Sequence, residues 1–433
     1  MNERDGEIAA GLMEEAGFTP ANDEIEADVL VLLTCCVREK AENKVYGKLG
    51  ELQKLKKKNP ELIIAVGGCM MQQPGVAEKV RQLAPHVDVI FGTHNLHQLP
   101  ELLRRVRELR QPVVAIWAQE GEVIEGLPAR RAGGSKALVN ISFGCNNFCS
   151  YCIVPYVRGR ERSRNPESIL SEIRRLVDEG VIEVTLLGQN VNSYGRDLGA
   201  GINFVSLLEQ VNSIPGLERI RFLTSHPRDF NPDLVKAMAR LEKICEHVHL
   251  PVQAGSNRVL ERMNRGYTRE DYFRLVDSLR AAIPDISITT DLIVGFPGES
   301  EGDFAQTLDL VERVQFDNAF TFMFSPRRGT PAADYPEQLP LEVKKERLSR
   351  LMEVQNAISR RKNEVFVGKE VEVLAEGHSK TDPEKISGRT RGNKLVIFAA
   401  PEDVVGRLVK VHITSAQTFL LKGEYIDALP KTG

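Results

Sequence analysis

Three cysteines share one short segment of the chain, Gly144–Cys152, which reads GCNNFCSYC. The spacing CxxxCxxC places Cys145, Cys149 and Cys152 on a single loop, and no fourth cysteine or histidine follows close by. A structural zinc site is normally closed by four ligands, so this pattern fits zinc poorly. Three thiolates instead suit an iron–sulfur cluster that leaves one iron open to a non-protein ligand.

A second group of cysteines follows two apolar runs near the N-terminus. Cys35 ends LLTC and Cys69 ends VGGC, each directly after a predicted parallel strand. Such residues converge at the carboxyl edge of an α/β sheet, where ligands bind. Because consecutive residues tend to point apart, we expect only one of Cys35 and Cys36 to be a ligand, and we select Cys35. The alternative is two unrelated buried thiols, which are common in proteins; Cys245 is expected to be such a core residue.

Composition places the chain among cytosolic proteins. It has 433 residues, a net charge of −3 and seven cysteines, an odd number that does not suggest a disulfide framework. No apolar run approaches the length of about 20 residues that a membrane span needs, and the acidic N-terminus does not resemble a secretory signal. We therefore expect a cytoplasmic protein, with no membrane partner, that has two to four domains.

The elements that must position these cysteines follow three patterns. In residues 1–110 apolar strands alternate with helices, which predicts a doubly wound parallel α/β domain. Residues 111–130 lose this periodicity and are interpreted as a linker. The expected elements of the first domain are helices at 5–16, 37–57, 73–83 and 96–109, and strands at 27–33, 62–66 and 87–91.

Residues 131–362 repeat a strand–helix unit six times. This predicts an incomplete, TIM-like (β/α)6 barrel, whose chemistry lies at the carboxyl ends of the strands. The cysteine loop follows the first of these strands, at 137–143, and a long helix at 341–362 ends the unit. The other expected strands are at 181–187, 219–224, 247–252, 287–294 and 318–324, and the helices are at 168–179, 205–212, 232–240, 270–282 and 300–314.

Residues 363–430 change to short alternating strands separated by turn residues. Such a pattern predicts a small β-barrel of the kind that binds oligonucleotides, although a mere capping domain is the alternative. From residue 360 onward the chain has 13 Lys and Arg against 10 Asp and Glu. Directly after the cysteine loop, the run RGRERSR contains Arg158, Arg160 and Arg162, which we expect to contact phosphate or carboxylate groups of RNA or another substrate; a solvated charged face is the alternative.

The order of motifs along the whole chain resembles the methylthiotransferases of the radical S-adenosylmethionine superfamily. The resemblance is closest to the branch that acts on N6-dimethylallyladenosine in tRNA. It rests on TCCVRE, GGCMMQQ, SFGCNNFCSYCIVPYVRGRERSR, LLGQNVNSYG, TSHP, HLPVQAGS, RMNRGYT, TDLIVGFPGE and FSPRRGTPAA.

The resemblance implies two 4Fe–4S clusters with S-adenosylmethionine as cosubstrate. Cys145, Cys149 and Cys152 would bind the radical cluster, and Cys35 and Cys69 would bind an auxiliary cluster in the N-terminal domain. The C-terminal barrel would be a TRAM domain that binds tRNA. S-adenosylmethionine would be contacted by Tyr151, the aromatic residue before the third cysteine. Polar and glycine residues at three strand ends would complete its surroundings: Gly188, Gln189, Asn190, Gln253 and Gly295.

The family usually has a third auxiliary cysteine in a GCQMN motif after the first strand. This sequence begins at Met1–Asn2–Glu3, where the MN of that motif would fall. We therefore expect an upstream extension that encodes a strand and a cysteine.

The implied reaction places a methylthio group on C2 of N6-dimethylallyladenosine next to the tRNA anticodon. That carbon is unactivated, so a radical is needed to replace its hydrogen. The implied partners are the tRNA anticodon stem-loop and an electron donor such as flavodoxin or ferredoxin, and we expect a monomer. The alternatives are the same transfer to threonylcarbamoyladenosine in tRNA or to a ribosomal protein side chain, and a non-catalytic RNA-binding protein with structural metal.

Overall fold

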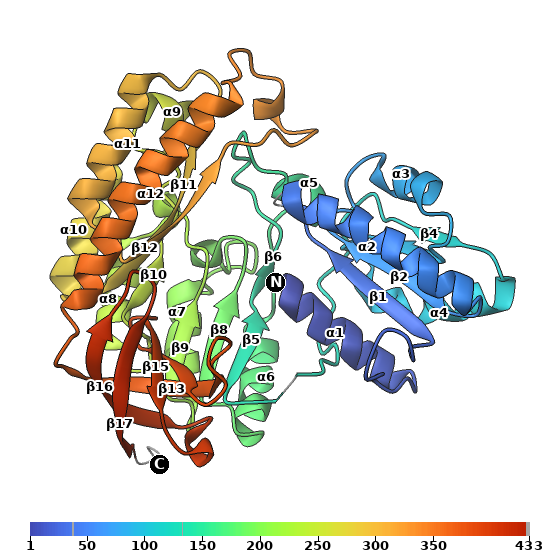
Figure 1. Cartoon of the computed structure of the whole chain (residues 1–433), viewed down its shortest axis with the longest axis horizontal. Coiled ribbons are helices and arrows are strands. Elements are labelled where there is room, and N and C mark those ends of the chain that lie inside the picture. The colour runs from blue at the N-terminus through green and yellow to red at the C-terminus, as the bar shows by residue number, and fades with distance from the viewer. Residues whose placement is uncertain (37–38, 132, 430–433) are drawn as a thin grey trace. The chain divides into compact units, whose positions relative to one another are not determined.

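The chain folds into two compact units, described here from a computed structural model of residues 1–36, 39–131 and 133–429 (Figure 1). The first unit comprises Met1–Ala132, Ser142–Arg164 and Arg327–Thr330, and the second comprises Gly133–Ile141, Asn165–Pro326 and Pro331–Gly433. The cysteine loop therefore makes its contacts within the first unit, although along the chain it follows a strand of the second. Within the described ranges, no helix is both long and apolar enough to cross a membrane.

The first unit is built on a parallel sheet of four strands in the order β1-β2-β3-β4. Its strands are β1 (Val29–Thr34), β2 (Ile63–Gly68), β3 (Val89–Phe91) and β4 (Val113–Ala115). Helices α1 (Asn2–Glu15) and α4 (Leu99–Leu109) pack on one face of this sheet. Helices α2 (Glu39–Lys58) and α3 (Val76–Leu83) pack on the other. Apolar residues on both strand faces require helices on both sides, and the predicted doubly wound domain is confirmed.

Two details of this unit differ from the expectation. The segment interpreted as a linker begins with β4, which pairs in parallel with β3. A strand of three residues is too short to produce a recognisable alternation, which is why the pattern missed it. The expected helix at 37–57 is observed as α2, but residues 37–38 lie outside the described residues, as does residue 430 at the end of the expected C-terminal domain.

The second unit contains the predicted partial barrel as two parallel three-stranded sheets, β5-β8-β9 and β10-β11-β12. A parallel bridge between Ile220 and Ile244 links them. The strands are β5 (Lys136–Asn140), β8 (Glu183–Leu187), β9 (Arg219–Phe222), β10 (His247–His249), β11 (Ser287–Val294) and β12 (Asn318–Met323). The helices are α6 (Pro166–Asp178), α7 (Phe204–Asn212), α8 (Pro232–Arg240), α9 (Asn257–Arg262), α10 (Arg269–Ala282), α11 (Glu301–Val314) and α12 (Leu341–Glu364).

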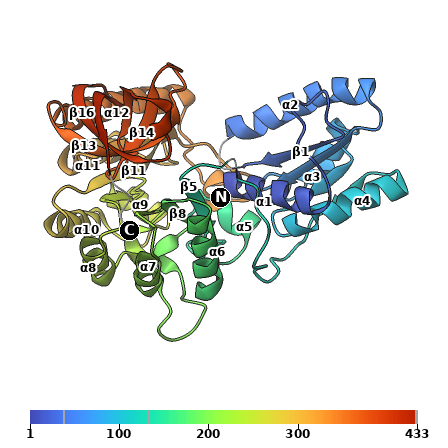
Figure 2. The ribbon, with the colours of Figure 1, turned by 90° about the horizontal axis from the view of Figure 1, so that it is seen from below.

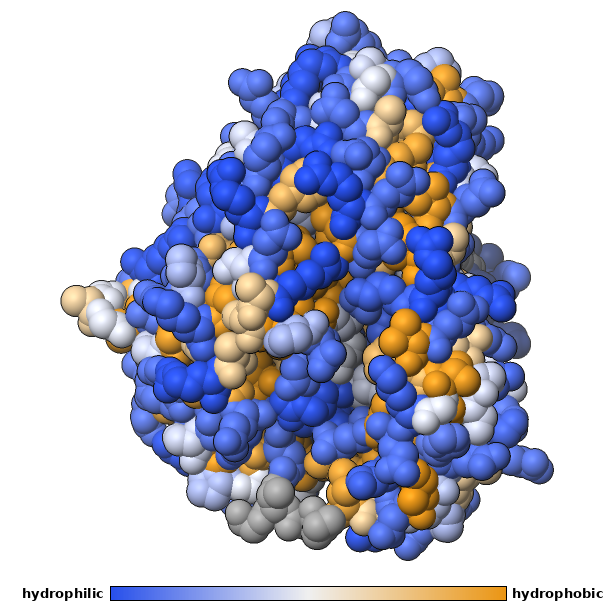
Figure 3. Space-filling model, turned by 90° about the vertical axis from the view of Figure 1, so that its left-hand side faces the viewer, coloured by the Kyte–Doolittle hydropathy of each residue, from blue (hydrophilic) through white to orange (hydrophobic). Residues whose placement is uncertain are grey.

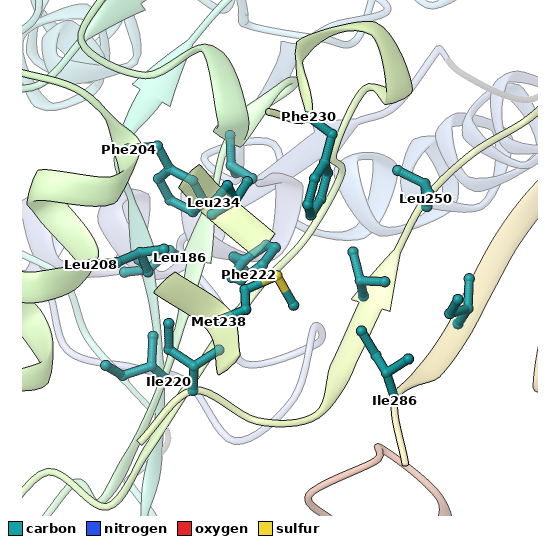
Figure 4. Close-up of a cluster of buried hydrophobic side chains, with 14 of the residues drawn as sticks. Leu186, Phe204, Leu208, Ile220, Phe222, Phe230, Leu234, Met238, Leu250 and Ile286 are labelled. Atoms are coloured by element: carbon teal, nitrogen blue, oxygen red, sulfur yellow. The ribbon is translucent and has the colours of Figure 1, made fainter. Parts of the chain in front are cut away.

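The core of the second unit lies between these strands and the helices outside them (Figure 4). Ile220 and Phe222 of β9 are fully or almost fully buried, and Phe222 contacts Phe204 of α7 edge to face with ring centroids 5.2 Å apart. Arg219 and Arg221 alternate with these two residues along the strand, so their side chains point to the opposite face of the sheet. Alternation thus separates an apolar helix-facing side of the strands from a polar side. Outside this core, hydrophilic side chains cover most of the face that carries α10 and α11 (Figure 3).

Five C-terminal strands form the predicted small barrel, which is closed in the order β13-β14-β15-β17-β16 (Figure 2). They are β13 (Glu370–His378), β14 (Ile386–Thr390), β15 (Leu395–Ala399), β16 (Leu408–Ala416) and β17 (Leu421–Ala428). The side-chain amide of Asn363, near the end of α12, donates to the carbonyls of Gln417 and Thr418 at 2.8 and 3.0 Å. This contact joins the last helix of the partial barrel to the turn between β16 and β17.

Arginines of β9 attach this closed barrel to the partial barrel. Arg219 is fully buried and donates to the Glu372 carboxylate at 2.6 Å, and Arg221 donates to the carbonyl of Thr390 at 2.8 Å. In the reverse direction, Arg391 reaches the Glu246 carboxylate at 2.8 Å. These contacts satisfy the fully buried guanidinium of Arg219 with groups of the closed barrel. The closed barrel is therefore an integral part of the second unit.

Candidate cluster-binding sites

The loop with three cysteines is closed at its base by a short antiparallel ribbon. Strand β6 (Ser142–Phe143) pairs with β7 (Arg162–Ser163), so the chain leaves and returns at the same place. Between them, the amide of Cys145 donates to the carbonyl of Gly159 at 3.1 Å. Gly144 has φ +72°, and a Cβ there would lie 2.0 Å from the carbonyl oxygen of Arg160. Glycine is therefore required at this position for the loop to close.

The thiols of this loop are protected from water to different degrees. Cys145 and Cys149 are buried, with 8% and 6% of their surface exposed, and Cys152 is half-buried. Burial raises the pKa of the Cys145 thiol to about 11, and the neighbouring Cys149 adds to this effect. A thiol of this kind ionises when a bound cation compensates its charge, as a metal ligand must.

The donor set of the loop fits an iron–sulfur cluster. All seven cysteines lie in the described part of the chain, and none of them is in a disulfide. No three His, Cys, Asp or Glu side chains among the described residues are arranged around a single metal ion. The irons of a cluster are held by separate thiolates, so they do not require such convergence. Cys145, Cys149 and Cys152 would hold such a cluster through three of its irons.

The second group of cysteines lies at the carboxyl edge of the sheet, as predicted. Cys35 and Cys36 follow β1 and Cys69 follows β2, directly after Thr34 and Gly68, which are register partners. The thiol that meets Cys69 is that of Cys36, through a side-chain hydrogen bond. Cys36 is 1% exposed, whereas Cys35, the residue we selected, is half-buried. In this structure the pair at the sheet edge is therefore Cys36–Cys69.

The Cys36–Cys69 pair is electrostatically asymmetric. The hydrogen bond with Cys69, burial and the neighbouring thiols raise the pKa of Cys36. The hydrogen bond from Cys36 lowers the pKa of Cys69, and the guanidinium of Arg158 lowers it further. The guanidinium of Arg158, which donates to Sγ of Cys69 at 3.2 Å, favours the thiolate form of Cys69, the form that binds a metal.

The three arginines that follow the cysteine loop differ in exposure, and one of them corrects the prediction. Arg158 ends α5 (Val154–Arg158), is 8% exposed, and is bonded to Cys69 and Asp5, so it does not present its guanidinium to RNA. Arg160 is exposed, and its guanidinium lies 4.6 Å from the centroid of the Phe148 ring. Arg162 is half-buried and donates to the carbonyl of Gly121.

Apart from Tyr151, the residues expected to contact S-adenosylmethionine follow barrel strands, and Asn190 and Gly295 among them have structural partners. Gly188, Gln189 and Asn190 follow β8, and the amide of Asn190 donates to Asp229 at 2.7 Å. Gly295 follows β11 with φ +72° and donates its N–H to the Glu299 carboxylate at 3.1 Å. Asn190 therefore orders a loop, and Gly295 shapes a turn.

Gln253 and Tyr151 complete the predicted cofactor residues. Gln253 forms a parallel bridge with Leu292 of β11, and its own φ is +73°. This strained backbone places Gln253 beside the carboxyl end of β11, the neighbourhood of Gly295. Tyr151 is half-buried within the cysteine loop.

The positive charge of the C-terminal barrel is partly used within the second unit. Arg391 binds Glu246, and Lys394 lies 2.8 Å from Asp317. Basic residues that remain exposed include Lys369, Arg407 and Lys422. The net positive charge of this region is therefore larger than the positive charge that its surface offers to a polyanion.

Sequence reasoning missed Asp5, the carboxylate that pairs with Arg158 at 2.6 Å. The two residues are 153 positions apart, and Asp5 belongs to an ordinary amphipathic helix. No local pattern marks such a contact, because it depends on how α1 and α5 meet within the first unit.

Three family models match the chain. The radical SAM superfamily model matches residues 139–311, the TRAM domain model matches residues 364–426, and a model described as uncharacterized protein family UPF0004 matches residues 1–92. These ranges cover most of the partial barrel with its cysteine loop, most of the closed barrel, and the strands that precede Cys35 and Cys69.

The chain is also similar to individual proteins over nearly its full length. It is 66% identical to tRNA-2-methylthio-N(6)-dimethylallyladenosine synthase of Moorella thermoacetica, over 99% of this chain and 96% of that protein. It is 58% identical to the protein of the same name from Syntrophomonas wolfei, with the same coverage. Among solved structures, a radical S-adenosylmethionine methyltransferase, TsrM, from Kitasatospora setae has a TM-score of 0.53 at 15% identity, over 79% of this chain and 76% of that one. At this identity the likeness concerns the fold alone.

Proposed function

The chain belongs to the tRNA-2-methylthio-N(6)-dimethylallyladenosine synthases of the radical SAM superfamily, and we propose that it carries out the reaction that this name describes. It would replace the hydrogen on C2 of N6-dimethylallyladenosine in tRNA with a methylthio group. When bound, two 4Fe–4S clusters and S-adenosylmethionine would supply the electron, the methyl group and the radical, and a sulfide held at the auxiliary cluster would supply the sulfur atom. The observation that carries the proposal is the closed loop with Cys145, Cys149 and Cys152 in a chain that is 66% identical to a named relative.

We propose that the residues divide this work between two places in the first unit. The loop thiols would hold the cluster that cleaves S-adenosylmethionine, and burial of Cys145 and Cys149 keeps water away from them. Cys69 and Cys35, with Cys36 in hydrogen-bond contact with Cys69, would hold the auxiliary cluster at the sheet edge. Gly188, Gln189, Asn190, Gln253, Gly295 and Tyr151 remain the proposed surroundings of S-adenosylmethionine.

The remaining assignments follow from the same family. The proposed domains are an α/β domain at 1–110 to which β4 adds a strand, the radical barrel at 131–362 and the TRAM domain at 363–430. Arg160 and Arg162 are the proposed RNA contacts near the loop. An electron donor such as flavodoxin or ferredoxin, a monomeric state and a cytoplasmic location complete the proposal.

One experiment separates this function from its alternatives. The protein is reconstituted anaerobically with iron and sulfide and incubated with S-adenosylmethionine, a reductant, and tRNA containing N6-dimethylallyladenosine. Parallel incubations use tRNA containing threonylcarbamoyladenosine and ribosomal protein. Mass analysis should find the methylthio increment on N6-dimethylallyladenosine alone. An increment on another substrate, or on none, would refute the assignment.

A further inference from the structure

Arg158 joins the two groups of cysteines in the first unit. It is the last residue of α5, the helix that begins directly after the cysteine loop. Its Nε–H donates to Sγ of Cys69 at 3.2 Å, and its Nη2 donates to Oδ2 of Asp5 at 2.6 Å. Ile153, directly before this helix, and Val157 within it pack in one apolar cluster with Cys36 and Cys69. The helix thus places a cation against a cysteine at the sheet edge.

The guanidinium of Arg158 keeps its charge although it is buried. Burial, the largest single influence, lowers its pKa, but Asp5 and Cys69 together hold the pKa above its ordinary value. A buried charge persists only where partners replace its hydration. One partner is a carboxylate that belongs to α1, and the other is a sulfur atom. An ion pair with Asp5 would by itself suffice to tie α5 to α1, so the N–H···S bond points to a second role.

We propose that Arg158 is a positioning residue for the auxiliary cluster, in which its N–H donates to the ligand sulfur of Cys69 and raises the reduction potential of that cluster. The inference rests on the proposed function, because it requires Cys69 to bind iron. Hydrogen bonds to ligand sulfurs and nearby positive charge stabilise the more electron-rich reduced state of an iron–sulfur cluster. Arginine suits this role because its fork donates to two acceptors at once.

The test needs a protein that holds only the auxiliary cluster. We would replace Cys145, Cys149 and Cys152 together with alanine, reconstitute the full chain anaerobically, and measure the midpoint potential by a redox titration followed by electron paramagnetic resonance. In this background three variants are compared: Arg158→Lys, Asp5→Asn, and Arg158→Gln combined with Asp5→Asn. The double variant avoids leaving the Asp5 carboxylate buried without its cation.

The expected shifts have opposite signs. Asp5→Asn removes a negative charge and should move the potential upward. Adding Arg158→Gln to it should move the potential below that of Asp5→Asn alone, because the donated hydrogen bond and the cation are both lost. Arg158→Lys keeps the positive charge but loses the guanidinium that donates to two acceptors. Its midpoint potential should therefore lie between that of the parent and that of a variant without the cation. The matched control, Arg160→Gln, removes a charge from the same segment but lies over Phe148 and should leave the potential unchanged.

The outcomes distinguish the inference from the function on which it rests. If the parent holds its iron but Arg158→Gln with Asp5→Asn has the same potential as Asp5→Asn, Arg158 has only a structural role and the inference is overturned. If the parent holds no iron at all, Cys69 is not a cluster ligand, and the proposed auxiliary site fails together with the inference. Iron content is measured in every variant, so that a variant that fails to fold is recognised. If the double variant does not fold, the potential of Arg158→Lys decides whether Arg158 affects the cluster.

Discussion

The two groups of cysteines lie in one compact unit but are specified in different ways. Cys145, Cys149 and Cys152 belong to one segment, closed by a two-strand ribbon and a glycine that tolerates no side chain. Cys36 and Cys69 come from the ends of different strands and meet only because Thr34 pairs with Gly68 in the β1–β2 register. A local loop keeps its geometry through its own backbone contacts, whereas a site at a sheet edge depends on the whole sheet. We therefore expect the two sites to respond differently to substitution.

The largest effect should follow from removing the loop thiols. Replacing Cys145, Cys149 and Cys152 together with alanine should abolish the reductive cleavage of S-adenosylmethionine, since no site then offers it an open iron. Production of 5′-deoxyadenosine, measured by liquid chromatography, should fall to the level without enzyme. Because the sheet-edge cysteines are untouched, iron should still be present. Continued 5′-deoxyadenosine production would show that the open iron lies elsewhere.

Removing Cys69 should have the complementary effect. Cys69→Ala should abolish methylthio transfer to tRNA, yet leave the cleavage of S-adenosylmethionine within about twofold, because separate sites respond independently. Cys245→Ala is the matched control, since Cys245 is buried in the second unit and should change neither activity. Loss of cleavage in Cys69→Ala would mean that the two sites are not separable.

The third comparison is between neighbours, Cys35 and Cys36. If the contact seen between Cys36 and Cys69 reflects the metal site, Cys36→Ala should lower the iron content as far as Cys69→Ala does, with a smaller loss for Cys35→Ala. Iron and sulfide are measured per chain in the background that lacks the loop cysteines. The reverse order, with full iron in Cys36→Ala and little in Cys35→Ala, would restore Cys35 as the ligand and limit the Cys36–Cys69 contact to the metal-free chain.

The same contrast explains how far sequence reasoning reached. The loop was predicted because its chemistry lies in the spacing of one segment, and the strands of the partial barrel were predicted because each has a regular apolar pattern. The choice between Cys35 and Cys36 could not be predicted, since it depends on how the chain turns after β1. The fate of Arg158 was missed for a similar reason: a run of arginines suggests exposed charge, whereas one of them is buried against Asp5 and Cys69.

The smallest expected effect concerns the arginine that stays exposed. Arg160→Gln should weaken tRNA binding and lower the slope of log affinity against log salt by about 1, as expected for one lost phosphate contact. Iron content and the cleavage of S-adenosylmethionine without tRNA should not change. Filter binding at several salt concentrations measures the slope. An unaltered slope would remove Arg160 from the proposed RNA surface.

The most direct test of the central claim is transfer of the methylthio group itself. The reconstituted protein, S-adenosylmethionine and a reductant are incubated with tRNA that carries N6-dimethylallyladenosine, and the nucleosides are analysed by mass spectrometry for 2-methylthio-N6-dimethylallyladenosine. The account predicts that this product forms with the unmodified chain and with Cys245→Ala, and that it is absent with Cys69→Ala and with the loop triple variant. Product formed by either of the last two would contradict the assignment of the two cysteine sites.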